Sequence, residues 1–204
     1  MSPPARITLV RHGETSANVE GVWHGSTDTA LTERGHAQAG LVASYLHARQ
    51  PRPAALYTSP LQRARHTAEA IGGAVGLTPL IRPEIAEYHL GAWEGKTYSE
   101  LIGSHKLFER MSRDPDFQPG GGESPRQVAT RIADALRTIA EAHAGESVIV
   151  VAHAGALTVG LGLLLDGDPG TWRRTMDNCA VSELTLTPEP TLLSFNETSH
   201  LDGV

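Results

Sequence analysis

Short apolar runs bounded by turn residues alternate with segments of helical periodicity along most of the chain. Four such runs cover residues 7–10, 54–58, 77–82 and 147–152. The last run is almost continuously apolar, which is typical of a central strand buried on both faces of a parallel sheet. We therefore expect an α/β fold, a three-layer sandwich with a mostly parallel central sheet and helices on both faces.

The helices between these strands are predicted from apolar positions at helical spacing and from the residues that begin them. Ser, Thr and Pro are favoured at the start of a helix. On these signals, helices are expected to begin at Thr32, at Ser59, at Thr97 with a capping box to Glu100, at Ser124 and at Ala156. Loops are expected over 21–29, 83–95, 114–122 and 166–177, and a closing hairpin over 181–187 and 191–195.

Composition narrows the function classes. With 204 residues, of which 40% are hydrophobic and 20% charged, the chain is expected to form a single domain over 1–204. A net charge of -6 argues against a nucleic-acid partner, so any anion site must be local. The lone Cys179 predicts neither a disulfide nor a zinc site. Residues 1–6 contain no long apolar run, and no run reaches membrane-spanning length, so we expect a cytoplasmic protein without a membrane partner. A homodimer stays open.

The end of the first expected strand carries the first candidate chemistry. Arg11 and His12 follow this strand directly, and Gly13 lets the backbone turn away. Ligands of open α/β sheets bind beyond the carboxyl ends of the strands. The arginine offers a planar fork of donors to phosphate oxygens, and a histidine with an ordinary pKa of about 6.5 is a nitrogen nucleophile. A solvated Arg-His turn is the alternative at this point.

Other charged residues are expected at the same edge of the sheet. His153 follows the apolar strand 147–152, Arg63 and Arg65 lie at the start of a helix, and Glu87 lies in an irregular segment. An arginine in the first turn opposes the helix dipole and requires an anion nearby. Each residue alone fits a structural role. Together they predict one crevice, because strand ends and helix starts converge in such a fold.

The order of these motifs resembles that of the histidine phosphatase superfamily, also called phosphoglycerate mutase-like. The similarity covers nearly the whole chain and rests on five blocks: Arg11-His12-Gly13-Glu14-Thr15, Ser59-Pro60-Leu61-Gln62-Arg63-Ala64, Glu87 followed by Gly91, Trp93, Glu94 and Gly95, Gly122-Glu123-Ser124, and Val151-Ala152-His153-Ala154-Gly155.

The resemblance implies a histidine acid phosphatase-type phosphoric monoester hydrolase without a metal or other cofactor. His12 would attack phosphorus and become a phosphohistidine, and Glu87 would protonate the leaving alcohol. Arg11, Arg63 and His153 would surround the phosphate oxygens, with His153 as an imidazolium. Residue chemistry adds that one ring nitrogen of His12 must donate to an acceptor, which we expect in the turn around Gly13.

The resemblance leaves the substrate open. It is expected to be a small phosphorylated metabolite, and sugar phosphates, phosphoglycerate derivatives, phosphoserine and ribazole phosphate all fit. The residues expected to bind it are Asn18, Trp23, His24, Gly25, Tyr88, His89 and Ala154.

Two other functions compete with hydrolysis. A bisphosphoglycerate-dependent mutase needs a closed site with further basic residues, and residues 95–122 offer only Lys96, Lys106, Arg110 and Arg113. A non-catalytic phosphate-binding module would not need the nucleophile, the second histidine and the acid, all of which are present. Hydrolysis is therefore the favoured function.

Overall fold

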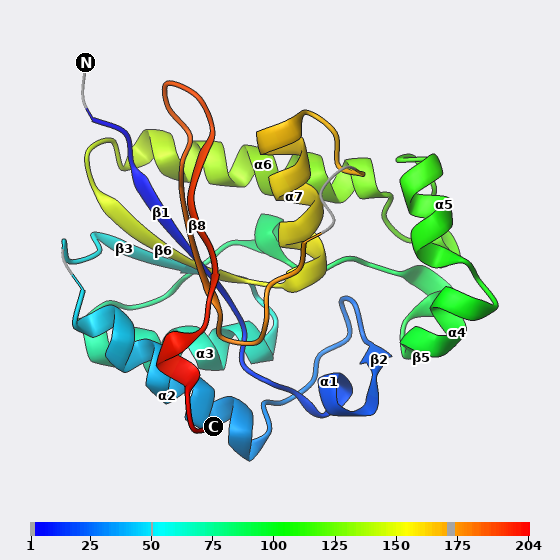
Figure 1. Ribbon diagram of the computed structural model, residues 1–204, viewed down its shortest axis with the longest axis horizontal. Helices are drawn as coiled ribbons and strands as arrows, with labels where there is room; N and C mark the ends of the chain where they lie inside the picture. Colours follow the sequence, from blue (N-terminus) through cyan, green and yellow to red (C-terminus); the bar gives the residue numbers. More distant parts are fainter. Residues whose placement is uncertain (1–2, 50, 171–173) are drawn as a thin grey trace.

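The computed structural model describes residues 3–49, 51–170 and 174–204. A six-stranded sheet in the order β4-β3-β6-β1-β7-β8 forms its centre (Figure 1). Its strands are β1 (Arg6–Arg11), β3 (Ala55–Thr58), β4 (Leu80–Ile81), β6 (Ser147–Ala152), β7 (Val181–Thr185) and β8 (Thr191–Glu197). The strands β4, β3, β6 and β1 are parallel, whereas β7 and β8 are antiparallel to their neighbours. The predicted α/β fold with a mostly parallel sheet is confirmed.

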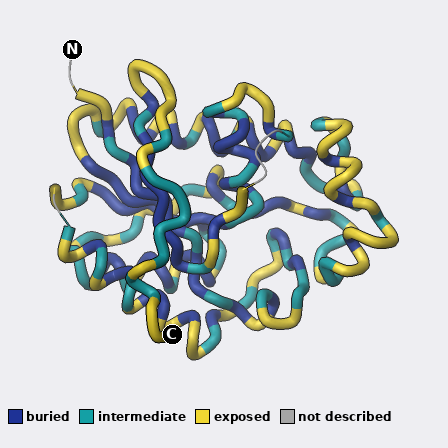
Figure 2. Tube along the Cα trace, in the orientation of Figure 1, coloured by how far each residue is buried: buried dark blue, intermediate teal, exposed yellow. Residues whose placement is uncertain are grey.

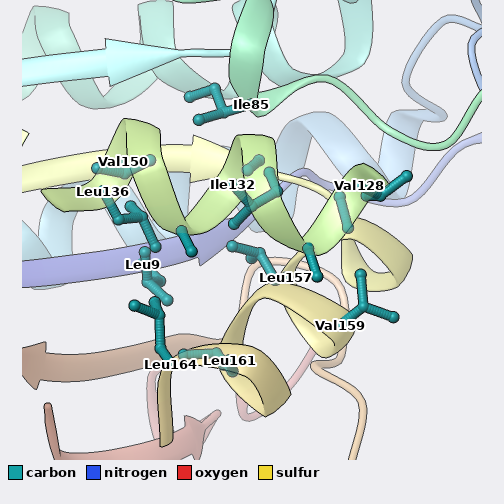
Figure 3. Packing of buried hydrophobic residues seen from close by; sticks show 14 of the residues in the cluster. Leu9, Ile85, Val128, Ile132, Leu136, Val150, Leu157, Val159, Leu161 and Leu164 are labelled. Carbon is teal, nitrogen blue, oxygen red and sulfur yellow. The ribbon is translucent and has the colours of Figure 1, made fainter. Parts of the chain in front are cut away.

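Helices cover both faces of this sheet. The helices are α2 (Glu33–His47) and α3 (Gln62–Val75) on one face, and α6 (Pro125–Ala142) and α7 (Ala154–Asp166) on the other (Figure 1). Side chains of the central strand alternate between the two layers: Val148 and Val150 pack with α6 and α7, whereas Ile149 and Val151 pack with α2 and α3. Figure 3 shows the packing of α6 and α7 over β1 and β6.

The pairing of β1 with β6 places the two histidines side by side. Arg11 pairs with Ala152 at the carboxyl ends of these parallel strands. The backbone N–H of His12 then donates to the Ala152 carbonyl at 3.1 Å, which extends the ladder by one residue. His153 is the N-cap residue of α7. Two segments far apart in the sequence thus deliver their histidines to one edge of the sheet, as predicted.

Helix α3 begins at Gln62, later than predicted. Its N-cap residue is Leu61, whose N–H donates to the Ser59 hydroxyl at 3.3 Å, and the same hydroxyl lies 2.7 Å from Nε2 of His153. The Asp28 carboxylate instead accepts a hydrogen bond from the Gln62 N–H at 2.9 Å. A loop remote in sequence therefore caps this helix and supplies the anion that its N-terminus favours.

Several helices and strands are too short for the spacing of apolar residues to predict them. They include α1 (Ser16–Glu20), β2 (Val22–Trp23) and α5 (Leu107–Arg113). The predicted strand 77–82 is reduced to β4. Residues 171–173 of the predicted loop 166–177 lie outside the described residues.

A smaller region extends beyond the carboxyl ends of the central strands (Figure 1). It contains the two-stranded pair of β2 with β5 (Lys96–Thr97), followed by α4 (Tyr98–Gly103) and α5. The predicted capping box of Thr97 and Glu100 begins α4. Figure 2 shows that much of α4 and α5 is exposed, unlike the central strands β1, β3 and β6 of the sheet.

Short 3₁₀ helices connect these parts. They are η1 (Pro83–Ile85), η2 (Gly91–Trp93), η3 (Pro119–Gly121) and η4 (Ser199–Leu201). Among the helices that the structure describes, none combines the length and apolar character needed to cross a membrane.

Candidate active site

His12 lines a cavity of about 630 Å3 and is 4% exposed. Its Nδ1 lies 2.8 Å from the carbonyl oxygen of Gly13, the acceptor expected in this turn. With Nδ1–H donating to that carbonyl, Nε2 carries the free electron pair. Burial holds the pKa of His12 well below its usual value, and the charges of Arg11 and Arg63 act in the same direction. The ring is therefore neutral, and Nε2 is available as a nucleophile.

Gly13 is needed for a close backbone approach. A Cβ at Gly13 would lie 2.5 Å from the carbonyl oxygen of Gly35 at the start of α2. The Gly13 N–H donates to Oγ1 of Thr67 in α3 at 3.0 Å. Helices α2 and α3 thus hold the turn that orients His12.

Among the described residues, the arginines that line the cavity are Arg11, Arg63 and Arg174. Arg63 is 4% exposed, and its guanidinium donates to the carbonyls of Gly25 at 2.7 Å and Thr27 at 2.9 Å. Arg11 donates to the Met176 carbonyl at 2.7 Å. Arg65, the other arginine considered from the sequence, is exposed and pairs with Glu69 at 3.8 Å. Of the three arginines considered from the sequence, Arg11 and Arg63 therefore line the cavity and Arg65 does not; Arg174 lines it as well.

His153 is completely buried beside these groups. Its ring centroid lies 5.1 Å from that of His12, and Arg63 Nε donates to its Nδ1 at 3.3 Å. The Ser59 hydroxyl lies 2.7 Å from the other ring nitrogen. Burial holds the pKa of His153 well below its usual value, with the charge of Arg63 acting in the same direction. Without a bound anion the ring is therefore neutral, and the imidazolium expected around a phosphate group stays a prediction; the described lining of the cavity includes Arg63 but not His153.

The two buried neutral histidines predict a loss of stability in acid. Below the ordinary histidine pKa of about 6.5 the unfolded chain binds protons that the folded chain does not, so the free energy of unfolding falls as pH falls. His12→Asn should make the free energy of unfolding less dependent on pH, by up to about 1.4 kcal/mol per pH unit. Urea unfolding between about pH 6.5 and 4.5 measures it. His47→Asn, at an exposed position of α2, is the control; equal slopes in both variants would contradict the buried neutral state of His12.

Glu87 is held at the N-terminus of α7. Its carboxylate accepts hydrogen bonds from the backbone N–H groups of Ala156 at 2.7 Å, Gly155 at 3.0 Å and Tyr88 at 2.9 Å. A Cβ at Gly155 would lie 2.8 Å from the carboxylate and 3.0 Å from the Trp23 ring. The absence of a side chain at Gly155 therefore leaves room for the carboxylate and the indole.

Arg131 of α6 braces the backbone around Glu87. Its guanidinium donates to the carbonyls of Ala86 at 2.6 Å and Glu87 at 3.0 Å. Glu123, from the fourth sequence block, accepts two hydrogen bonds from the same guanidinium at 2.8 and 2.9 Å. Sequence reasoning missed Arg131, because nothing local in α6 marks it as different from the other arginines of that helix.

Arg131→Met is expected to lower kcat about 10-fold if the chain hydrolyses phosphate esters as the sequence predicts, because small displacements of Glu87, the predicted acid, have large effects. Inhibition by inorganic phosphate should be unchanged, since Arg11 and Arg63 do not contact Arg131 in the described hydrogen bonds. Steady-state kinetics separate the two effects. Arg137→Met, on the exposed side of α6, is the control; a parallel loss of phosphate inhibition would indicate general disruption instead of positioning.

Glu94 organises the loop that holds Arg63. Its carboxylate accepts from the backbone N–H groups of Ser26 and Thr27 at 3.0 Å and from both hydroxyls. Burial acts to raise the pKa of Glu94, but these hydrogen bonds outweigh it and lower the pKa. A sequence block far from this loop therefore fixes the carbonyls that orient Arg63.

The cavity includes most of the residues expected to bind substrate, and it corrects one. Those that line it are Asn18, Trp23, His24, Gly25, Tyr88 and Ala154. His89 is exposed and outside the lining, because its backbone N–H and carbonyl pair with Glu123. The expected substrate contact of His89 is therefore wrong.

Other lining residues come from segments outside the five sequence blocks. Asn178 donates to the His12 carbonyl at 3.0 Å and to Oδ1 of Asn18 at 3.1 Å. Tyr98 and Phe108 reach the cavity from α4 and α5. Their elements have no motif, and only the fold brings them to the site.

Comparison with known proteins places this geometry among phosphatases. A model of the histidine phosphatase superfamily (branch 1) matches residues 7–198. The metal-independent phosphoserine phosphatase of Arabidopsis thaliana is 36% identical over 210 residues, which cover 100% of this chain and 86% of that protein. The chain spans half the length of mycobacterial relatives that are 34% identical.

Solved structures agree with the fold. Phosphoserine phosphatase from Entamoeba histolytica, in complex with 3-phosphoglyceric acid, has a TM-score of 0.86 at 28% identity and covers 97% of this chain and 99% of its own. Mycobacterial glucosyl-3-phosphoglycerate phosphatase, in complex with VO3, has a TM-score of 0.84 at 28% identity, with coverages of 95% and 99%.

Proposed function

The chain belongs to the histidine phosphatase superfamily, branch 1, and on that premise we propose that it hydrolyses a small phosphorylated metabolite through a phosphohistidine on His12. The observation that carries this proposal is the hydrogen bond of His12 Nδ1 to the Gly13 carbonyl, which leaves Nε2 free beside two arginines. Relatives named as phosphatases of phosphoserine and of glucosyl-3-phosphoglycerate support the reaction class.

In the first half-reaction, Nε2 of His12 forms a bond to phosphorus as the bond from phosphorus to the ester oxygen breaks. Arg11 and Arg63 stabilise the charge on the three equatorial oxygens. Glu87, in its carboxylic acid form, gives its proton to the leaving alkoxide, which departs as the alcohol. The phosphoryl group remains on His12.

In the second half-reaction, water attacks the phosphohistidine. The Glu87 carboxylate takes one proton from this water, the bond from nitrogen to phosphorus breaks, and inorganic phosphate leaves. The acid and the neutral nucleophile are then restored.

Because the pKa of His12 is held well below its usual value, the nucleophile stays neutral in mild acid, which supports activity of the acid phosphatase type.

The basic residues of the α4–α5 region argue against a mutase. None of Lys96, Lys106, Arg110 and Arg113 lines the cavity. Arg113 pairs with Glu109 at 2.9 Å, and the Arg110 guanidinium lies 3.8 Å from the Phe117 ring centroid. These four residues therefore add no positive charge to the lining of the cavity, which supports transfer to water.

The test is phosphate release from a panel of phosphorylated metabolites in the presence of a chelator. We expect release of inorganic phosphate, unchanged by the chelator because the arginines supply the positive charge. Labelled substrate offered with excess unlabelled alcohol distinguishes the acceptors. Label recovered in phosphate supports hydrolysis, whereas label recovered in the second alcohol would establish a phosphotransferase.

A further inference from the structure

Aromatic side chains form the wall of the cavity next to the catalytic groups. The ring centroid of Trp23 lies 5.9 Å from that of Tyr98 and 6.1 Å from that of Phe108, both in stacked orientation. Tyr88 meets the same indole edge-on at 5.8 Å. Burial raises the pKa of Tyr98 and the charge of Glu87 acts in the same direction, whereas the charges of Arg11 and Arg63 act to lower it.

Phe108 differs from its aromatic neighbours in exposure. It is 46% exposed although it lines the cavity, whereas Trp23 is 8% exposed and Tyr88 1%. A phenyl ring that is stacked on one partner and otherwise exposed offers a surface for another planar ring. Met111 and Val159 extend the apolar lining beside it.

The lining holds three arginines, Arg11, Arg63 and Arg174, but it offers no available carboxylate to an ammonium group of the alcohol. Glu87 is the sole carboxylate among the described lining residues, and three backbone N–H groups already bind it. An ammonium group in the alcohol would therefore lose its hydration without gaining an available carboxylate partner.

Three buried polar atoms of lining residues have no hydrogen-bond partner in the described part of the chain. They are Nδ1 of His24, Oγ1 of Thr29 and the hydroxyl of Tyr88. Buried polar groups are normally paired, so these atoms are suited to bind hydroxyl groups or heteroatoms of a ligand. A cavity of about 630 Å3 is also of the size that accommodates ligands larger than a phosphorylated amino acid.

We propose that the preferred substrate is a phosphomonoester whose alcohol carries a planar aromatic or heteroaromatic ring, and that Phe108 is a specificity-determining residue that stacks on this ring. The proposal rests on the proposed phosphatase function and specifies its substrate class. Nucleoside 5′-phosphates and arylalkyl phosphates belong to that class.

The experiment compares three esters of primary alcohols, so that leaving-group chemistry stays similar: 2-phenylethyl phosphate, propyl phosphate and O-phospho-L-serine. We expect kcat/KM for 2-phenylethyl phosphate to exceed that for phosphoserine about 10-fold. Phe108→Ala should reduce the ratio of kcat/KM for 2-phenylethyl phosphate to that for propyl phosphate about 10-fold. Ile102→Ala, an exposed apolar position of α4 outside the cavity, should leave both values unchanged.

Equal or higher kcat/KM for phosphoserine, or an unchanged ratio in Phe108→Ala, would overturn the proposed substrate class while leaving the phosphatase function intact. If no ester is hydrolysed, the phosphatase function fails, and calorimetric binding to the His12→Ala chain decides the substrate class. Tighter binding of 2-phenylethyl phosphate than of phosphoserine supports the ring site, and the reverse order overturns it.

Discussion

Replacing His12 by alanine is expected to lower kcat for ester hydrolysis at least about 10³-fold, because the variant loses the atom that accepts the phosphoryl group. Its neighbours Arg11 and Arg63 keep their backbone hydrogen-bond partners, so inorganic phosphate should still bind. Phosphate release measures the first effect and calorimetry the second.

The control for this variant is His47→Ala, since His47 is exposed at the end of α2 and far from the cavity lining in sequence and fold. It should keep full activity. Substantial hydrolysis by His12→Ala would mean that water attacks the ester directly, with the histidine in a secondary role.

Arg63→Met is expected to lower kcat about 10²-fold to 10³-fold, the effect of removing one preorganised donor from a site of developing negative charge. Methionine keeps the apolar stem but loses the donors to Gly25 and Thr27. It also leaves Nδ1 of His153 without its donor. Phosphate inhibition should weaken together with kcat.

Arg65→Met provides a matched control from the first turn of the same helix. Arg65 is exposed and pairs only at 3.8 Å with Glu69, and such surface pairs contribute little. Kinetics and thermal unfolding should match the parent chain. Equal losses in Arg63→Met and Arg65→Met would show that the helix, rather than the buried guanidinium, carries the effect.

Much of the fold follows from local sequence. The apolar strand 147–152 and the helix that begins at Ser124 are found as predicted, because a continuous apolar run and a capping residue before helical spacing act locally. The start of α3 is not determined by local sequence. The carboxylate of Asp28 accepts a hydrogen bond from the first N–H of this helix, and the Ser59 hydroxyl lies against His153. Tertiary contacts therefore override the sequence signal.

The same distinction holds for the site. Strand ends predict that His12 and His153 meet, since parallel pairing aligns them. The brace from Arg131 and the aromatic wall from Tyr98 and Phe108 depend on how remote helices pack, which no short motif encodes. His89 shows the opposite error: proximity in sequence to Glu87 does not bring it into the cavity.

The most direct test of the central claim is to trap the covalent intermediate. Glu87→Gln cannot accept a proton from water, so p-nitrophenyl phosphate, whose leaving group needs no acid, should load the enzyme faster than water clears it. Mass spectrometry after a rapid quench under alkaline conditions should find one acid-labile phosphoryl group, on His12. A chain that turns over without a phosphoryl group, or that carries it on another residue, would contradict the account.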